Sequence, residues 1–335
     1  MSLRILRPGL LTTVQDLGRF GYQSDGIIVS GAMDALALRV ANRLVGNPET
    51  AAGLEITLLG PRIRFEADHL IALTGAHLSP TLNGQPVGLH RPVWVAADTE
   101  LAFGPAVAGC RSYLAVAGGV AVPPVLGSRS TYLRAGFGGF EGRALRAGDT
   151  LPVGAPAAIG TKLMQLLARP GAAWAATDFT PGPALCPRPA YRPVLRAVHG
   201  PEYGQFSAES QRAFWAEPFT ITPAADRMGY RLHGPPLARL AATELLSSAV
   251  TFGTVQVPAG GQPIVLGADC QTTGGYPRLA QVISVDWPAL AQAAPGQPLR
   301  FREVSVAEAQ ALYAAREVAL AGLRRGIALR VHLSP

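Results

Sequence analysis

At 335 residues the chain exceeds the usual size of one domain, about 100 to 200 residues, so two domains are expected. Hydrophobic residues make up 48% and charged residues 15%, which excludes extended disorder, and the charge of +7 comes from scattered arginines, which excludes a nucleic-acid partner. The longest apolar stretch, 114–126, contains two prolines and is shorter than the roughly 18 to 20 residues that span a bilayer, so we predict a cytoplasmic protein with no membrane partner.

The predicted elements are mostly short strands, because 38 glycines and 29 prolines separate β-rich runs. In chain order, a helix is expected from about Ala32 to Val45, and a short one near Ser207 to Trp215. A last helix follows Ser305, which forms a capping box with Glu308. The clearest predicted strands are Leu70 to Thr74, Pro92 to Ala97, Ser112 to Ala117, Phe219 to Thr222 and Gln281 to Val285.

The segment 168–193 is rich in alanine, proline and glycine and shows neither helical nor strand periodicity. We interpret it as a crossover linker between an N-terminal half, 1–167, and a C-terminal half, 194–335. Each half is expected to enclose its own core.

Several familiar kinds of site are missing from the sequence. The three cysteines and six histidines show no ligand spacing, so no metal site is expected. The single lysine, Lys162, follows Thr161 and cannot complete a Walker-type phosphate loop. Its neighbours are also wrong for a biotinyl carrier, so no biotin is expected on this chain, and carboxyl transfer would need biotin on another chain.

A polar, glycine-bounded stretch near the start contains Asp16 and Arg19. A guanidinium can hold a carboxylate through two parallel hydrogen bonds, which suits recognition of an amino-acid-like anion. The alternative is an ion pair that braces a turn. Asp226 and Arg227 form a second carboxylate and guanidinium pair, with the same two interpretations.

The turn Gly127–Thr131, followed by the glycines at 136–139, offers hydroxyl and backbone N–H donors and one arginine. Such donors suit an anion, although glycine-rich turns are commonly only turns. The candidate anion-binding residues are Ser128, Arg129 and Ser130.

The most unusual stretch is the polar, glycine-rich run 269–277, which follows an apolar strand. Unpaired polar groups at a strand end lose solvation, so a binding loop is the simplest explanation and a polar β-bulge is the alternative. Asp269 is suited to accept a proton or orient a nucleophile. The candidate binding residues are Gln271 and Thr272 for an amide or lactam, Gly274 and Gly275 for close backbone approach, and Tyr276.

These stretches together resemble one protein family, which comprises the C-type subunits of 5-oxoprolinase, allophanate hydrolase subunit 2 and biotin-dependent carboxyltransferases, with kinase-inhibitor antagonists among its relatives. The resemblance implies a mainly β fold of two cyclophilin-like β-barrel domains with a few short helices. It rests on the motifs at 13–21, 30–34, 47–48, 111–119, 127–131, 226–232 and 271–277.

The resemblance also implies an activity and partners. It implies an ATP-dependent 5-oxoprolinase that converts 5-oxo-L-proline to L-glutamate together with A-type and B-type subunits, with ATP shared with or bound by a partner. The alternatives are carboxyl transfer to urea or a related amide, and a regulatory protein that sequesters the B-type subunit. On the enzyme hypothesis Asp16, Asp226 and Asp269 are the catalytic candidates. Arg19, Arg227 and the loop residues bind substrate, and all are expected in one cleft.

Overall fold

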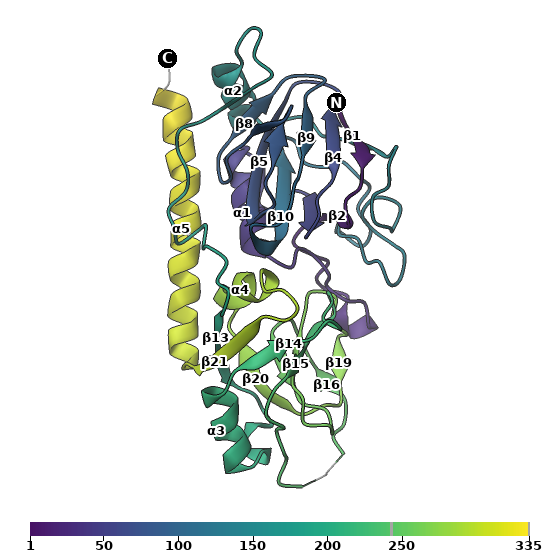
Figure 1. The fold of residues 1–335 in the computed structure, drawn as a ribbon, viewed down its shortest axis with the longest axis vertical. Helices are drawn as coiled ribbons and strands as arrows, with labels where there is room; N and C mark the ends of the chain where they lie inside the picture. Colours follow the sequence, from purple (N-terminus) through teal and green to yellow (C-terminus); the bar gives the residue numbers. More distant parts are fainter. Residues whose placement is uncertain (242–243, 334–335) are drawn as a thin grey trace. The chain divides into compact units, whose positions relative to one another are not determined.

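The computed structural model describes residues 1–241 and 244–333, and the mainly β class is confirmed (Figure 1). The chain divides into two compact units, which are described separately. Unit 1 comprises Met1–Gly18, Asp34–Arg188 and Arg316–Pro335, and unit 2 comprises Arg19–Met33 and Pro189–Ala315.

The predicted boundaries lie at 167 and 194. The observed division differs because residues 19–33 belong to unit 2 and the C-terminal segment from Arg316 belongs to unit 1. Met33, at the start of the predicted first helix, is packed into the core of unit 2. Leu320, Ile327 and Val331, near the C-terminus, are buried in a cluster of unit 1. The expected linker also contains a strand that pairs within unit 1. Long-range burial of this kind leaves no local composition signal.

Unit 1 consists of two six-stranded sheets whose inner faces share one apolar core. Alternating apolar side chains on the strands supply that core, as expected for half-buried β-structure. The first sheet has the order β11 (Thr150–Pro152), β1 (Ser2–Arg7), β4 (Arg62–Phe65), β9 (Glu100–Ala102), β6 (Thr81–Leu82), β7 (Gln85–Pro86). The second has the order β12 (Trp174–Ala176), β8 (Val93–Val95), β5 (His69–His77), β10 (Ala108–Val116), β3 (Gly53–Thr57), β2 (Leu11–Gln15).

Helix α1 (Ala35–Leu44) confirms the predicted N-terminal helix, and it packs on β5 and β10. Asp34 caps it, because its carboxylate accepts a 2.9 Å hydrogen bond from the backbone N–H of Ala37. Helix α2 (Ala158–Leu167) was not predicted. Its first turn lacks a capping side chain, so the usual start signal is missing from the sequence.

Unit 2 is built around a closed seven-stranded barrel. All its strand pairs are antiparallel except β13 with β21. The barrel has the order β13 (Val194–His199), β20 (Arg278–Val282), β17 (Thr254–Gln256), β18 (Ile264–Leu266), β15 (Gly229–His233), β14 (Phe219–Ile221), β21 (Pro298–Glu303), and a separate ladder joins β16 (Ser248–Ala249) to β19 (Thr273–Gly274).

Three further helices begin in unit 2. The predicted short helix is confirmed as α3 (Ala208–Ala216), and the predicted last helix as α5 (Val306–Leu333). Ser305 accepts a 3.1 Å hydrogen bond from the backbone N–H of Glu308, as its position predicted. Helix α4 (Trp287–Ala291) was missed, and the strand expected to reach Val285 ends at Val282 because a short 3₁₀ turn follows. No helix within the described ranges is long and apolar enough to cross a membrane.

Candidate functional site

Asp16, directly after β2, is a buried carboxylate at the centre of a hydrogen-bond network in unit 1. Its Oδ1 accepts from the hydroxyls of Ser128 at 2.7 Å and Ser130 at 2.5 Å, and from the backbone N–H of Gly18 at 2.8 Å. Its Oδ2 accepts from the backbone N–H of Arg129 at 2.5 Å. Four donors therefore converge on one carboxylate that is only 7% exposed.

The turn predicted to bind an anion thus holds the anion of its own chain. The Ser128 and Ser130 hydroxyls are directed at Asp16 and are fully buried. The Arg129 guanidinium donates to the carbonyl of Val122 at 2.7 Å. The two hydroxyls and the Arg129 backbone N–H donate to a carboxylate, but nothing in the sequence connected residue 16 with a turn more than a hundred positions away.

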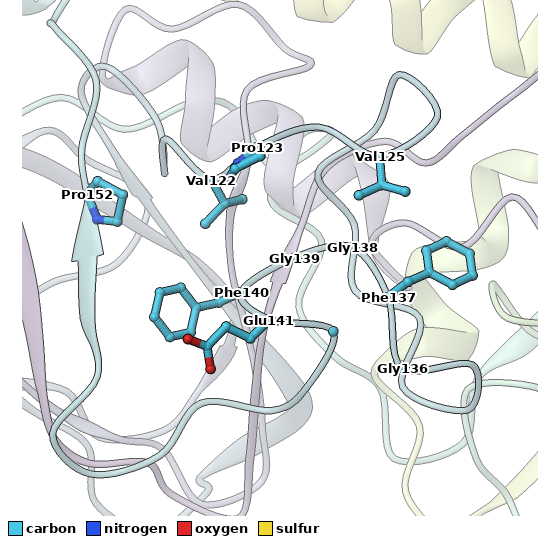
Figure 2. Close-up of a pocket in the computed structure, with 11 residues that line it drawn as sticks. Val122, Pro123, Val125, Gly136, Phe137, Gly138, Gly139, Phe140, Glu141 and Pro152 are labelled. Atoms are coloured by element: carbon cyan, nitrogen blue, oxygen red, sulfur yellow. The ribbon is translucent and has the colours of Figure 1, made fainter.

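A pocket of about 430 Å³ adjoins this turn within unit 1, and Figure 2 shows the side chains that line it. The Val122 carbonyl is bonded to Arg129, and the Val125 N–H donates to the Ser128 carbonyl at 2.8 Å. The Asp16 network therefore also fixes one wall of the pocket. The lining residues are Val122, Pro123, Val125, Gly136, Phe137, Gly138, Gly139, Phe140, Glu141, Gly142 and Pro152.

In unit 2, Asp269 and Arg227 form a buried bidentate ion pair. The Arg227 Nε lies 2.8 Å from Asp269 Oδ2 and its Nη2 lies 2.9 Å from Oδ1. The Ser30 hydroxyl donates to the same Oδ1 at 2.7 Å, and Arg227 Nη2 also donates to the Gly31 carbonyl at 2.6 Å. The pair joins the segment 30–31 to the start of the predicted binding loop. Its carboxylate is engaged by an arginine and a hydroxyl, which suits positioning better than proton transfer.

The expected pairing of Asp226 with its neighbour Arg227 is not what the structure shows. Asp226 is exposed, and its Oδ1 accepts from the backbone N–H groups of Met228 at 2.8 Å and Gly229 at 3.1 Å. This arrangement is an Asx-type turn at the start of β15. Arg227 is instead directed at Asp269.

The predicted loop 271–276 contains β19, which pairs with β16 in unit 2. A Cβ at Gly274 would lie 2.7 Å from the Gln256 side-chain nitrogen and 3.4 Å from that of Gln271, so a larger residue would require the Gln256 side chain to shift. Gln271 and Thr272 are half-buried, whereas Gly275 and Tyr276 are exposed. The loop therefore presents both amide-type partners and open backbone.

Asp16 and Arg19, which were predicted to form one site, belong to different units. Arg19 belongs to unit 2, where its backbone N–H donates to Val29 at 2.8 Å and its side chain is 1% exposed. Asp16 belongs to unit 1. A single cleft that unites all these residues stays a prediction.

A buried polar row in unit 1 was not identified as a site from the sequence. The row crosses the neighbouring strands β2, β3, β10 and β5, and its members are Thr13, Glu55, Tyr113 and Thr74 in that order. The Tyr113 hydroxyl donates to Glu55 at 2.7 Å and accepts from the Asp34 N–H at 2.7 Å. Burial is the largest cause that raises the pKa of Tyr113 well above its ordinary value, and the negative charges of Glu55 and Asp34 add to the effect. The neutral phenol therefore links the start of α1 to the sheet.

Comparison with known proteins gives one consistent result. Residues 25–303 match the family described as carboxyltransferase domain, subdomain A and B. The chain is 45% identical over 312 residues to the C-type 5-oxoprolinase subunit of Escherichia coli strain K12, and the match covers 92% of this chain and 93% of that protein.

More distant relatives are larger proteins. Urea amidolyase of Saccharomyces cerevisiae is 31% identical over 334 residues, which is 96% of this chain and 18% of that protein. The crystal structure of Kluyveromyces lactis urea carboxylase matches 97% of this chain and 29% of its own, with 28% identity and a TM-score of 0.87.

Proposed function

Since this chain belongs to the carboxyltransferase-domain family, whose members include the C-type 5-oxoprolinase subunit, we propose that it is the corresponding subunit of an ATP-dependent 5-oxoprolinase. The enzyme converts 5-oxo-L-proline to L-glutamate and acts in the cytoplasm as a complex with A-type and B-type subunits. The observation that carries the proposal is a match that extends over nearly the full length of both proteins.

The geometry supports a division of labour within the predicted site. Arg227 and the Ser30 hydroxyl both donate to Asp269, and this assembly fixes the start of the loop 271–276. The amide of Gln271 and the hydroxyl of Thr272 are suited to the N–H and carbonyl of a lactam. We assign Asp269 a positioning role and the loop the contact with the ring amide.

Two features that could have bound a nucleotide phosphate do not support ATP binding by this chain. Lys162 lies in the middle of helix α2, and the hydroxyls of Ser128 and Ser130 are used by Asp16. We therefore assign ATP to a partner subunit. Biotin is likewise not expected on Lys162, because a carrier lysine lies in an exposed hairpin rather than a helix.

A second candidate function is carboxyl transfer to urea or a related amide. The similarity to urea amidolyase and urea carboxylase favours it, although this chain spans less than a third of either protein. In that case biotin would be carried by another chain.

The two candidates are separated by substrate choice. The chain is combined with purified A-type and B-type partner subunits, and ATP hydrolysis is measured with 5-oxo-L-proline, or with urea, bicarbonate and a biotinylated carrier. The proposal requires ATP hydrolysis that depends on 5-oxo-L-proline and yields glutamate. Hydrolysis that depends only on urea would replace the proposal with the second candidate.

A further inference from the structure

The pocket beside the Asp16 turn has a form that the Asp16 network does not explain. Figure 2 shows Val122, Pro152 and Phe140 toward one side and Val125 and Phe137 toward the other, with Gly138 and Gly139 on the backbone between them. The walls are almost entirely apolar. A volume of about 430 Å³ is large enough for one or two side chains.

The backbone between the walls has hydrogen-bond donors without acceptors. Gly136 donates to the Tyr132 carbonyl at 3.0 Å, and Gly142 donates to the Gly138 carbonyl at 2.8 Å. Gly138 and Gly139 are both buried, yet their N–H groups donate to no acceptor among residues 1–241 and 244–333. Buried backbone N–H groups are nearly always paired, so two successive exceptions call for an external acceptor.

The local conformation keeps these two donors open. Gly138 and Gly139 both have positive φ, +71° and +57°, and a Cβ at Gly139 would come 1.9 Å from the Thr131 hydroxyl. Leu126 and Glu141 also adopt positive φ, 51° and 56°, although neither is a glycine. Strained residues of this kind persist where the surrounding structure fixes them, commonly at binding surfaces. Successive backbone N–H groups in a turn can form a concave site for an oxygen acceptor.

The charge at the rim indicates an uncharged occupant. Among the residues that line this pocket, Glu141 alone is ionisable, and its carboxylate is paired with Arg143, with Oε2 lying 3.0 Å from Nε and 2.6 Å from Nη2. Arg143 also binds Asp149 at 2.8 Å. One guanidinium therefore serves two carboxylates, and the pocket rim offers no free positive charge that would bind an anion.

We propose that this pocket is a docking site for an extended segment of a partner subunit. The segment inserts an apolar side chain between Phe137 and Val125 and presents a main-chain carbonyl oxygen to the N–H groups of Gly138 and Gly139. An extended peptide supplies both features at adjacent positions, as in other grooves that bind strands. The inference rests on the proposed function only for the existence of partner subunits.

The first test fills the pocket. Val125→Trp places an indole in the cavity from a position that is already 36% exposed, so the core is not disturbed. Val107→Trp is the matched control, because Val107 is an exposed valine of unit 1, outside the pocket lining, and its N–H also donates to a backbone carbonyl. Affinity for each purified partner subunit is measured by titration calorimetry. Val125→Trp is expected to raise the Kd for one subunit at least tenfold, and Val107→Trp to leave it unchanged.

The second test monitors the backbone N–H groups of Gly138 and Gly139 by hydrogen exchange. Hydrogen exchange of the segment 133–143 is expected to slow when the partner subunit binds, because Gly138 and Gly139 gain acceptors. An unchanged Kd for Val125→Trp overturns the proposal. Slowed exchange with 5-oxo-L-proline alone identifies a small-molecule site instead, and self-association lost in Val125→Trp identifies a second copy of this chain. If the complex forms but does not convert 5-oxo-L-proline, the proposed function fails while the Kd still decides the docking site.

Discussion

Asp16 in unit 1 and Asp269 in unit 2 are both buried aspartates in predicted sites, yet the protein holds them differently. Asp16 accepts from two hydroxyls and two backbone N–H groups, all of them neutral donors. Asp269 is paired with the Arg227 guanidinium and accepts from the Ser30 hydroxyl. Neutral donors stabilise a charge without bringing a second charge out of water. In a buried ion pair, by contrast, removal of one charge leaves the other buried without compensation.

Because the donors differ, the loss of each carboxylate should reduce stability by a different amount. Loss of Asp16 leaves unsatisfied but uncharged donors. Loss of the Asp269 charge leaves an arginine that is only 7% exposed without its counter-ion. The consequences should therefore be largest in unit 2.

Asp269→Asn is expected to have the largest effect, about 3 to 5 kcal/mol of lost unfolding free energy, because it breaks a buried ion pair from one side. Urea unfolding followed by the fluorescence of Trp215 and Trp287, which belong to unit 2, measures it. Arg227→Met combined with Asp269→Asn should recover part of the loss. If the double variant is as unstable as the two single losses added together, the two residues are not coupled.

Asp16→Ala is expected to cost about 2 to 3 kcal/mol, since the buried hydroxyls of Ser128 and Ser130 lose their acceptor. Chemical unfolding monitored by Trp94 and Trp174 of unit 1 is the measurement. Asp178→Ala changes an exposed aspartate of the same unit and serves as the control. Equal stability of the two variants would show that the Asp16 network contributes little.

A pH dependence should separate a partly exposed ion pair of unit 2 from these buried groups. The hydrogen bond from Arg278 lowers the pKa of Glu202 below its ordinary 4.5, although partial burial opposes the shift. A carboxylate with a lowered folded-state pKa stabilises the fold above its ordinary pKa, and that contribution disappears as the pH falls through the folded-state value. Glu202→Gln should therefore lower the free energy of unfolding by about 1.5 kcal/mol at pH 7. Below about pH 4.5 the variant should lose less stability on acidification than the wild type, because it has no carboxylate to protonate at this position. An identical acid profile in variant and wild type would contradict this.

Asp226→Asn is expected to have the smallest effect, less than about 0.5 kcal/mol, because asparagine retains the Oδ1 acceptor of the turn. Thermal unfolding of the variant beside Asp269→Asn gives the comparison directly. With the fold intact, any loss of turnover in the reconstituted complex would report chemistry rather than structure. A large loss of stability would mean that the turn needs the charge.

Local sequence signals predicted the elements well and the site contacts poorly. The apolar stripe before Gly46 indicated helix α1, and Ser305 indicated the start of α5, because each signal lies within a few residues of its effect. The partner of Asp16 is a turn 112 to 114 positions away, and Ser30 meets Asp269 across 239 positions. No spacing rule connects such residues, so only their polar character was predictable.

The subunit assignment is tested most directly by an omission experiment. Formation of labelled L-glutamate from labelled 5-oxo-L-proline and ATP is measured with this chain alone, with the A-type and B-type subunits alone, and with all three proteins. We expect turnover only when all three are present. Turnover by this chain alone, or full turnover by the two partners without it, would contradict the assignment.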